Sequence, residues 1–430
     1  MKNPLAVANR AKRPAAVWRR ARTLTRRYSL TAAAMDRALD HFCRILDRFR
    51  CGASFPLTAA VLERHRAVFA RYGERNLEFP VHGYTHSDYT RLDPARRAEH
   101  LARARRAFAA AGLAAEGFRA PYLCRSPDLD AQLVAAGFTF ASDQAILWDL
   151  PEADPAPGLA DYERAIAFYA PWRAAERPAL PRLQGRLVQI PVSLPDDEML
   201  VDRLGAGSAA WAEGAWRSIL AESHRRGELF TLQLHPERIA LCAPALTALL
   251  EAARGQRPPV WIALLGQVAA WWRARTAAAV HLRRAGNGRW QMTVQGPPGT
   301  TILARGLEIL GPAEPWADGY HRLPGAKAHV RSDRCPAVGL SPRCPPALAD
   351  FLRQQGYIVQ AEAKWPCALT LDRASFGPAD ERPLLARIES GGEPLLRLGR
   401  WPHGARSALV VSGDIDALTL GDFGLRVLGR

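Results

Sequence analysis

The chain has 430 residues, enough for one large core or two domains. Hydrophobic residues make up 48% and charged residues 23% of the sequence, the composition of an ordinary soluble globular protein. The net charge of +16 comes from 58 basic and 42 acidic residues, and almost all of the basic residues are arginines. No nucleic-acid-binding motif accompanies this charge, so we expect a solvated basic surface and no nucleic-acid partner.

Residues 1–30 form a basic N-terminal arm, with nine lysines and arginines before the first acidic residue, Asp36. No apolar stretch follows them as it would in a secretory signal, and no segment approaches the roughly 20 apolar residues of a membrane span. We therefore expect a cytoplasmic protein. The arm is interpreted either as a solvated extension or as a peripheral contact with an anionic membrane. The seven cysteines form no CxxC pair and are expected to be reduced thiols without function, although Cys335 and Cys344, each followed by proline, are alternative metal ligands.

Between residues 31 and 275, apolar runs alternate with amphipathic stretches. Met35, Leu39 and Phe42 keep the spacing of one helical face, with Thr31 as a candidate cap, and Asp93-Pro94 is typical of a helix start. The elements expected here are helices over 31–49, 93–112, 243–254 and 263–275, and strands over 53–57, 229–234 and 259–262. Repeated strand–helix units favour a parallel sheet or a (β/α) barrel.

The pattern changes after residue 275. Gly286-Asn287-Gly288 lies between two alternating runs and predicts a β-hairpin, and the sequence stays rich in Pro and Gly to residue 346. A helix over 346–355 and a strand over 357–360 are expected next. Residues 276–400 are thus predicted to be a β-rich accessory segment with a small α/β portion. Residues 401–430 contain the apolar run Ala408–Val411, which predicts one more buried strand.

Polar motifs follow four of the predicted strands. His82-Gly83-Tyr84-Thr85-His86 follows Phe79–Val81, Arg119-Ala120-Pro121-Tyr122 follows Gly117-Phe118, His235-Pro236 follows Leu232–Leu234, and Asp414-Ile415-Asp416 follows Ala408–Val411. Residues just past the carboxyl ends of barrel strands converge on one face. Two histidines and a carboxylate can bind a metal with a position left for water, and a second carboxylate can act as a base. The sequence therefore predicts a metal-dependent hydrolase whose site is formed by segments from both ends of the chain.

These motifs resemble those of the polysaccharide deacetylases, carbohydrate esterase family 4, also called the NodB-homology family. The family has an acidic motif, an HxxxH motif, an RxPY motif and a late LxH motif on a distorted (β/α) barrel. His82–His86, Arg119–Tyr122, Leu232–His235 and Asp414–Asp416 are similar to these four motifs. The resemblance covers residues 31–275 and about the last thirty residues. It implies an α/β fold in which a distorted (β/α) barrel carries the β-rich segment as an insertion.

The resemblance also implies a role for each motif residue. Asp416, His82 and His86 would hold a divalent metal, most simply zinc. Asp414 would be the general base, and Arg119 would keep it ionised and oriented. His235 would protonate the leaving amine, and the backbone N–H of Tyr122 would stabilise the oxyanion. Trp148, Trp271 and Trp272 are interpreted as core residues or as sugar-stacking faces.

The order of the motifs departs from the family, because the acidic motif comes last instead of first. We interpret this as a circular permutation that leaves residues 401–430 to complete the barrel. The alternatives are an abortive second copy of the motif, or two aspartates that cap a surface loop. The expected reaction is metal-assisted hydrolysis of an N-acetyl or O-acetyl group on a carbohydrate or acetylated amino sugar. Hydrolysis of a small non-peptide amide and non-catalytic carbohydrate binding remain as alternatives.

Overall fold

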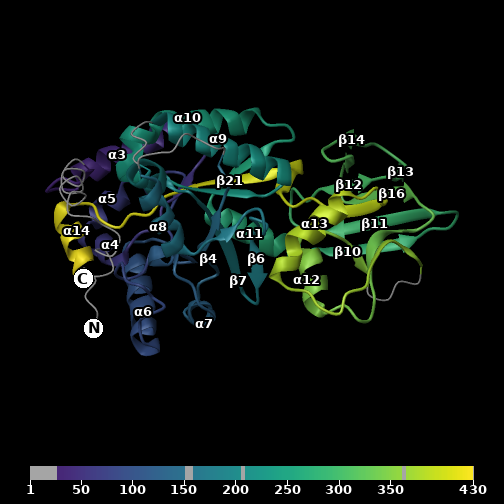
Figure 1. Ribbon diagram of the computed structural model, residues 1–430, viewed down its shortest axis with the longest axis horizontal. Helices are drawn as coiled ribbons and strands as arrows, with labels where there is room; N and C mark the ends of the chain where they lie inside the picture. Colours follow the sequence, from purple (N-terminus) through teal and green to yellow (C-terminus); the bar gives the residue numbers. More distant parts are fainter. Residues whose placement is uncertain (1–26, 151–157, 205–208, 361–364, 430) are drawn as a thin grey trace.

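The computed structural model of the chain describes residues 27–150, 158–204, 209–360 and 365–429. Residues 1–26 of the basic arm therefore lie outside the described part of the chain. The fold is mixed α/β (Figure 1). Among the described residues, no helix is both long enough and apolar enough to cross a bilayer.

The N-terminal part of the chain, up to residue 276, alternates strands with helices (Figure 1). Its elements are α3 (Ala33–Arg48), β1 (Ala53–Ser54), α4 (Ala59–Arg64), α5 (Arg66–Ala70), β2 (Leu77–Glu78), α6 (Pro94–Ala110), β3 (Gly117–Phe118), η1 (Pro121–Leu123), α7 (Pro127–Ala135), β4 (Phe140–Leu147), α8 (Leu159–Tyr169), β5 (Trp172–Arg173), β6 (Arg182–Gln184), β7 (Leu187–Leu194), η2 (Glu198–Arg203), α9 (Ala209–Arg226), β8 (Leu229–Gln233), η3 (Pro236–Arg238), α10 (Ile239–Gly255), β9 (Val260–Ala263) and α11 (Leu265–Thr276).

The rest of the chain forms short antiparallel sheets, a small parallel sheet and a return to the first part. Its elements are β10 (Ala279–Arg284), β11 (Arg289–Gln295), β12 (Ile302–Arg305), β13 (Glu308–Ile309), β14 (Glu314–Pro315), β15 (Tyr320–Leu323), β16 (Lys327–Arg331), β17 (Cys335–Leu340), α12 (Pro346–Gln354), β18 (Val359–Gln360), β19 (Cys367–Leu371), η4 (Pro378–Asp380), α13 (Glu381–Ser390), β20 (Leu395–Leu398), η5 (Pro402–Gly404), β21 (Ser407–Ser412) and α14 (Leu420–Val427).

The late strand β21 lies inside the sheet of the N-terminal part. Residues Ala408–Ser412 of β21 pair in parallel with β8, and the other edge of the strand pairs with β9 and then with β1. All six residues of β21 are buried, as are all five of β8, which suits parallel strands covered on both faces. Because β21 is buried within this sheet, Asp414 and Asp416 follow a buried strand and do not cap a surface loop.

Two parallel sheets make up the core of the N-terminal part. One has the order β2-β1-β21-β8, and the other has the order β3-β4-β7-β6, with β6 antiparallel to β7. A bridge between Val81 and Phe118 links the sheets on one side. On the other side, the Thr231 backbone N–H of β8 donates to Ser193 Oγ of β7 at 3.3 Å.

The accessory segment lies at the opposite end of the strands from the polar motifs (Figure 1). The start of β21 adjoins this segment, where Trp316 Nε1 donates to the carbonyl of Gly404 at 2.9 Å, and Asp414 follows the other end of the strand. Trp261, Trp272 and Trp401 pack together at the junction, with ring centroids 5.5–6.2 Å apart. The β-rich segment therefore does not lie over the polar motifs.

Most of the elements expected from the sequence are present, with some shifted boundaries. The hairpin around Asn287 forms between β10 and β11, and Asp93 caps α6 by accepting from the Arg96 N–H. The expected cap at Thr31 is wrong, because Ala32 occupies the N-cap position of α3, although Thr31 Oγ1 still accepts from the Ala33 N–H. The expected strands over 53–57 and 357–360 shrink to β1 and β18.

The tryptophans and cysteines are mostly buried rather than exposed. Trp148, Trp271 and Trp272 are at most 8% exposed, so they are core residues and not sugar-stacking faces. All seven cysteines are free thiols. Cys335 is the first residue of strand β17, and Cys344 Sγ contacts the carbonyl of Leu371 at 3.3 Å.

Candidate active site

Four strand ends bring the predicted motifs into one row. Parallel bridges join Ile415 to Leu57, Leu57 to Val81, and Val81 to Phe118. The side chains that directly follow these positions therefore emerge at the same end of the sheet. Leu234, which precedes His235, extends the row because its backbone N–H donates to the Ser412 carbonyl at 2.7 Å.

The two histidines of the HxxxH motif lie on a loop after β2, and not on a helix. Gly83 makes the turn between them with a φ of +76°, and a Cβ atom there would lie 2.7 Å from the Tyr89 ring. Only glycine fits that conformation and that space. The loop is further fixed by Tyr89, whose hydroxyl accepts from the Tyr84 N–H at 2.6 Å. The imidazole centroids of His82 and His86 are 5.1 Å apart as a result.

His82, His86 and Asp416 together form a candidate metal centre. Their ligand atoms all lie within 4.8 Å of one another. His82 Nε2 is 3.2 Å from Asp416 Oδ1, and His86 Nε2 is 3.5 Å from Asp416 Oδ2. The three side chains are at most 8% exposed, so the carboxylate lies in a site of low dielectric constant.

The hydrogen bonds around His82 fit a metal ligand. Its Nδ1 lies 2.8 Å from the carbonyl oxygen of Arg119 and must donate to it, because a carbonyl only accepts. In the neutral imidazole, Nε2 then presents a lone pair to Asp416 Oδ1. Both of these atoms are buried without a hydrogen-bond partner. Two acceptors that face each other in this way favour a cation between them, and a carbonyl behind a histidine is the usual support of such a ligand.

Asp414 lies beside this centre, and hydrogen bonds from neighbouring side chains hold both of its carboxylate oxygens. Arg119 Nη1 donates to Asp414 Oδ1 at 3.1 Å, and Gln233 Nε2 donates to Oδ2 at 3.1 Å. Arg119 is completely buried, and it is fixed in turn by the carbonyl and hydroxyl of Ser142 and by the hydroxyl of Ser412. Asp414 Oδ2 is 3.7 Å from His82 Nε2. The predicted pairing of Arg119 with Asp414 is therefore present in the structure.

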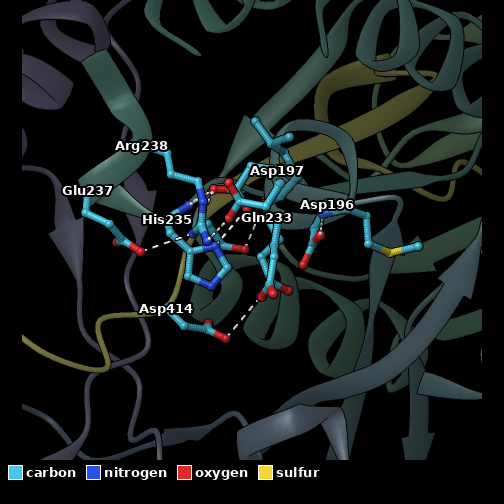
Figure 2. A network of polar contacts seen from close by, with 12 residues as sticks. Asp196, Asp197, Gln233, His235, Glu237, Arg238 and Asp414 are labelled. Atoms are coloured by element: carbon cyan, nitrogen blue, oxygen red, sulfur yellow. Dashed lines mark hydrogen bonds and ion pairs between the residues drawn. The ribbon is translucent and has the colours of Figure 1, made fainter. Parts of the chain in front are cut away.

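His235 belongs to a second charged group, which Figure 2 shows on one side of Asp414. Its Nδ1 is 2.7 Å from Asp197 Oδ1, and its backbone N–H donates to Asp197 Oδ2 at 2.9 Å. Burial disfavours the imidazolium, but the Asp197 carboxylate more than offsets burial and raises the pKa of His235 to about 10. His235 is therefore protonated at neutral pH and has a proton to give.

Tyr122 lies next to the metal centre on the η1 turn. Its backbone has a φ of 62°, which is uncommon for a bulky residue. Its ring packs edge-on against His86, with centroids 4.5 Å apart. The predicted oxyanion donor, the backbone N–H of Tyr122, therefore lies in a turn of uncommon conformation beside the candidate metal centre.

Four residues that contact the site were missed from the sequence: Asp197, Gln233, Ser412 and Arg426. Asp197 follows the apolar run of β7, so the rule of polar residues at strand ends would have found it. Gln233 and Ser412 face the site from within strands and lack any such signal. Arg426 Nη2 is 2.9 Å from Asp416 Oδ2, and no local sequence pattern indicates this contact.

Comparison with known proteins gives one match to a protein family. Residues 31–141 match the model of the family described as Polysaccharide deacetylase. This segment is therefore similar to the polysaccharide deacetylases. This matched segment includes the HxxxH and RxPY motifs, whereas His235, Asp414 and Asp416 lie beyond it. No curated protein matches the sequence.

Several solved structures are similar to part of the chain. A putative polysaccharide deacetylase from Mycobacterium smegmatis is 23% identical over 58% of this chain and 81% of its own, with a TM-score of 0.44. A probable polysaccharide deacetylase from Pseudomonas aeruginosa PAO1 is 17% identical over 55% of this chain and 73% of its own, with a TM-score of 0.43. Puue Allantoinase is 18% identical over 55% of this chain and 72% of its own, with a TM-score of 0.41.

Proposed function

We propose that this protein is a metal-dependent deacetylase that hydrolyses an N-acetyl group on a sugar. The observation that carries the proposal is the convergence of His82, His86 and Asp416, with a second carboxylate, Asp414, held beside them by Arg119. The match of residues 31–141 to the deacetylase family supports the reaction class. Zinc suits two imidazoles and one carboxylate with a position left open.

Each residue has a separate part in the proposed reaction. A metal held by His82, His86 and Asp416 would supply Lewis-acid activation of water and of the acyl carbonyl. Asp414 accepts the proton of the attacking water, and Arg119 holds this carboxylate in place. The Tyr122 backbone N–H donates to the acyl oxygen as negative charge develops on it. His235 gives its proton to the nitrogen that leaves, and Asp197 holds the imidazole in place for this step.

We also infer that the two parallel sheets form one distorted (β/α) barrel, which is circularly permuted relative to the family. The Val81–Phe118 bridge and the contact of Thr231 with Ser193 support closure on either side. The position of β21 between β1 and β8 supports the permutation. In this arrangement residues 401–430 complete the barrel, and residues 276–400 are the accessory segment.

The test of the proposed function is acetate release from acetylated amino sugars, with metal content measured on the same preparation. We expect one zinc or similar divalent ion per chain, release of acetate together with a free amine, and loss of release on chelation. Comparing acetate release from soluble, lipid-linked and polymeric N-acetylglucosamine shows which form of the sugar is the substrate. Release that a chelator does not affect would refute the mechanism. Turnover of small amides alone, or sugar binding without metal or turnover, would support one of the alternative functions.

We propose that the substrate is met inside the cell, which the seven free thiols support. Contact of the basic arm with a membrane stays a prediction, because residues 1–26 lie outside the described part of the chain. Co-sedimentation with vesicles containing about 30% anionic lipid should be lost in a chain that begins at residue 27 and weakened by salt. Equal binding of the shortened chain would refute a role for the arm.

A further inference from the structure

Arg426 of the last helix, α14, occupies the position of a cation in the candidate metal centre. Its Nη2 is 2.9 Å from Asp416 Oδ2 and 3.2 Å from His86 Nε2. A single nitrogen atom therefore touches two of the three groups that would hold a metal. His86 Nε2 must accept in this contact, because a guanidinium only donates. It offers the same lone pair to Arg426 that it would offer to a metal.

Helix α14 is fixed firmly at its start. The Thr419 hydroxyl accepts from the Asp422 N–H, and Asp422 in turn accepts from Arg64 Nε at 2.7 Å and lies 2.8 Å from His65 Nε2. Phe423 packs against the buried ring of Tyr28, with centroids 5.8 Å apart. Arg426 lies one turn after Asp422 and so projects from the same face of the helix. The helix therefore delivers the guanidinium to the site as a fixed part of the fold.

The side chain of Arg426 is nevertheless able to leave without unfolding the helix. It is 25% exposed, whereas the Asp416 side chain is 8% exposed. A change of rotamer toward solvent breaks the polar contacts with Asp416 and His86 and the stacking of the guanidinium over the Phe423 ring. Departure of Arg426 leaves the Asp416 carboxylate buried without its guanidinium partner, which is unfavourable unless another cation takes its place.

A guanidinium and a divalent metal cannot occupy this site together. Both are positive, both need Asp416 Oδ2 and His86 Nε2, and arginine does not lose its proton in proteins. In the absence of metal, Arg426 neutralises the buried Asp416, while Asp416 Oδ1 and His82 Nε2 remain without partners. Binding of a metal thus requires an exchange of one cation for another.

We propose that Arg426 competes with the metal for Asp416 and His86. The guanidinium contacts these two residues until a metal displaces it, and this competition sets the metal affinity of the site. This inference rests on the proposed metal centre. Because of this competition, the apparent metal affinity is the intrinsic affinity multiplied by the fraction of molecules in which the ligands are free. It also maintains the metal-free protein in its folded form, because the buried carboxylate keeps a partner.

The experiment compares zinc affinity, measured against a competing chelator, between the wild type and Arg426→Gln, which keeps most of the side-chain length and removes the charge. We expect zinc to bind the variant at least about tenfold more tightly, since the ligands are then always free. Thermal melting gives a second readout. The metal-free variant should melt below the metal-free wild type, and saturating zinc should remove most of this difference.

Two further variants separate competition from a general effect of charge. Arg217→Gln removes the same charge from the exposed surface of α9 and should leave zinc affinity unchanged. Arg426→Lys keeps a competing positive charge and should bind zinc more weakly than Arg426→Gln. Equal or weaker zinc binding by Arg426→Gln would overturn the inference. A wild type that binds no divalent metal would instead overturn the proposed metal centre.

Discussion

Two buried charged clusters lie at opposite ends of the β21 strand, and they are built in different ways. At the active-site end, the unpartnered buried atoms include the acceptors His82 Nε2 and Asp416 Oδ1. At the junction with the accessory segment, the unpartnered atoms include the donors Nε and Nη1 of Arg275 and Nε of Arg305. Buried acceptors that lack a donor favour binding of a cation, whereas buried donors that lack an acceptor do not. The first cluster therefore has the properties of a binding site.

The junction cluster has a structural explanation. Arg275, Arg397 and Arg400 converge on the C-terminal end of α12, where they donate to the Gln354 carbonyl, the Gln355 carbonyl and Gln355 Oε1. The negative end of a helix dipole stabilises such cations. The Arg275 guanidinium also stacks on the Trp272 ring at 4.4 Å. This cluster attaches the accessory segment to the N-terminal part of the chain, so burial of charge alone does not identify a functional site.

The largest effect on activity is expected from Asp414→Asn. The change removes the general base while the metal ligands remain, so we expect metal content to be retained and turnover to fall by about 10²–10⁴-fold. His82→Ala, His86→Ala and Asp416→Ala should each lose the metal as well as activity. Mass spectrometry of bound metal, combined with acetate release, checks both groups. If Asp414→Asn loses the metal and Asp416→Asn keeps it, the two roles are interchanged.

Glu389→Gln should change stability and leave activity unchanged, in contrast to the active-site variants. Glu389 accepts from Arg397 and lies 3.5 Å from Arg305 Nη1 at the junction. Its loss leaves buried arginines without their carboxylate, so we expect a decrease of roughly 2–4 kcal/mol in the free energy of unfolding, since breaking buried ion pairs is costly. Chemical denaturation measures this loss. A drop in kcat in the folded variant would show that the junction affects the active site.

The sequence was most informative where polar residues follow apolar strands. Residues His82, Arg119, His235 and Asp414 were all found by this rule, and the structure brings them together through the bridges of parallel strands. Strand lengths were less predictable, because β1 and β18 are defined by pairing partners far away in the chain. Side chains within strands, such as Gln233, reach the site only through register, which depends on the whole sheet.

Arg426 and Asp197 mark the limit of prediction from local patterns. Asp197 follows a strand and obeys the same rule as the motifs, but its partner His235 lies 38 residues later in the chain. Arg426 approaches the site because contacts with distant residues anchor α14, among them that of Asp422 with His65, 357 positions away in the sequence. Such contacts depend on the packing of helices around the sheets. A periodic pattern in α14 can indicate an amphipathic helix, but it does not indicate that Arg426 contacts the candidate metal centre.

The smallest expected effect concerns the pH dependence that Asp197 imposes on His235. Because the pKa of His235 is raised to about 10, from about 6.5 in an unfolded chain, the protonated ring stabilises the fold. This stabilisation is complete below pH of about 6.5 and is lost as the pH rises through about 10. The difference in the free energy of unfolding between the wild type and His235→Gln should therefore be larger at pH 6 than at pH 10.

Asp197→Asn carries this argument from stability to catalysis. Without the carboxylate, the pKa of His235 should fall toward its ordinary value, so the alkaline limb of kcat/KM should move toward neutral pH. We expect activity near pH 8 to drop by about tenfold more than activity near pH 6, since only protonated His235 can give its proton to the leaving nitrogen. Asp149→Asn is the control, because it removes a carboxylate that pairs with Arg173 at the surface, away from His235. An equal loss at both pH values would mean that Asp197 only positions the ring.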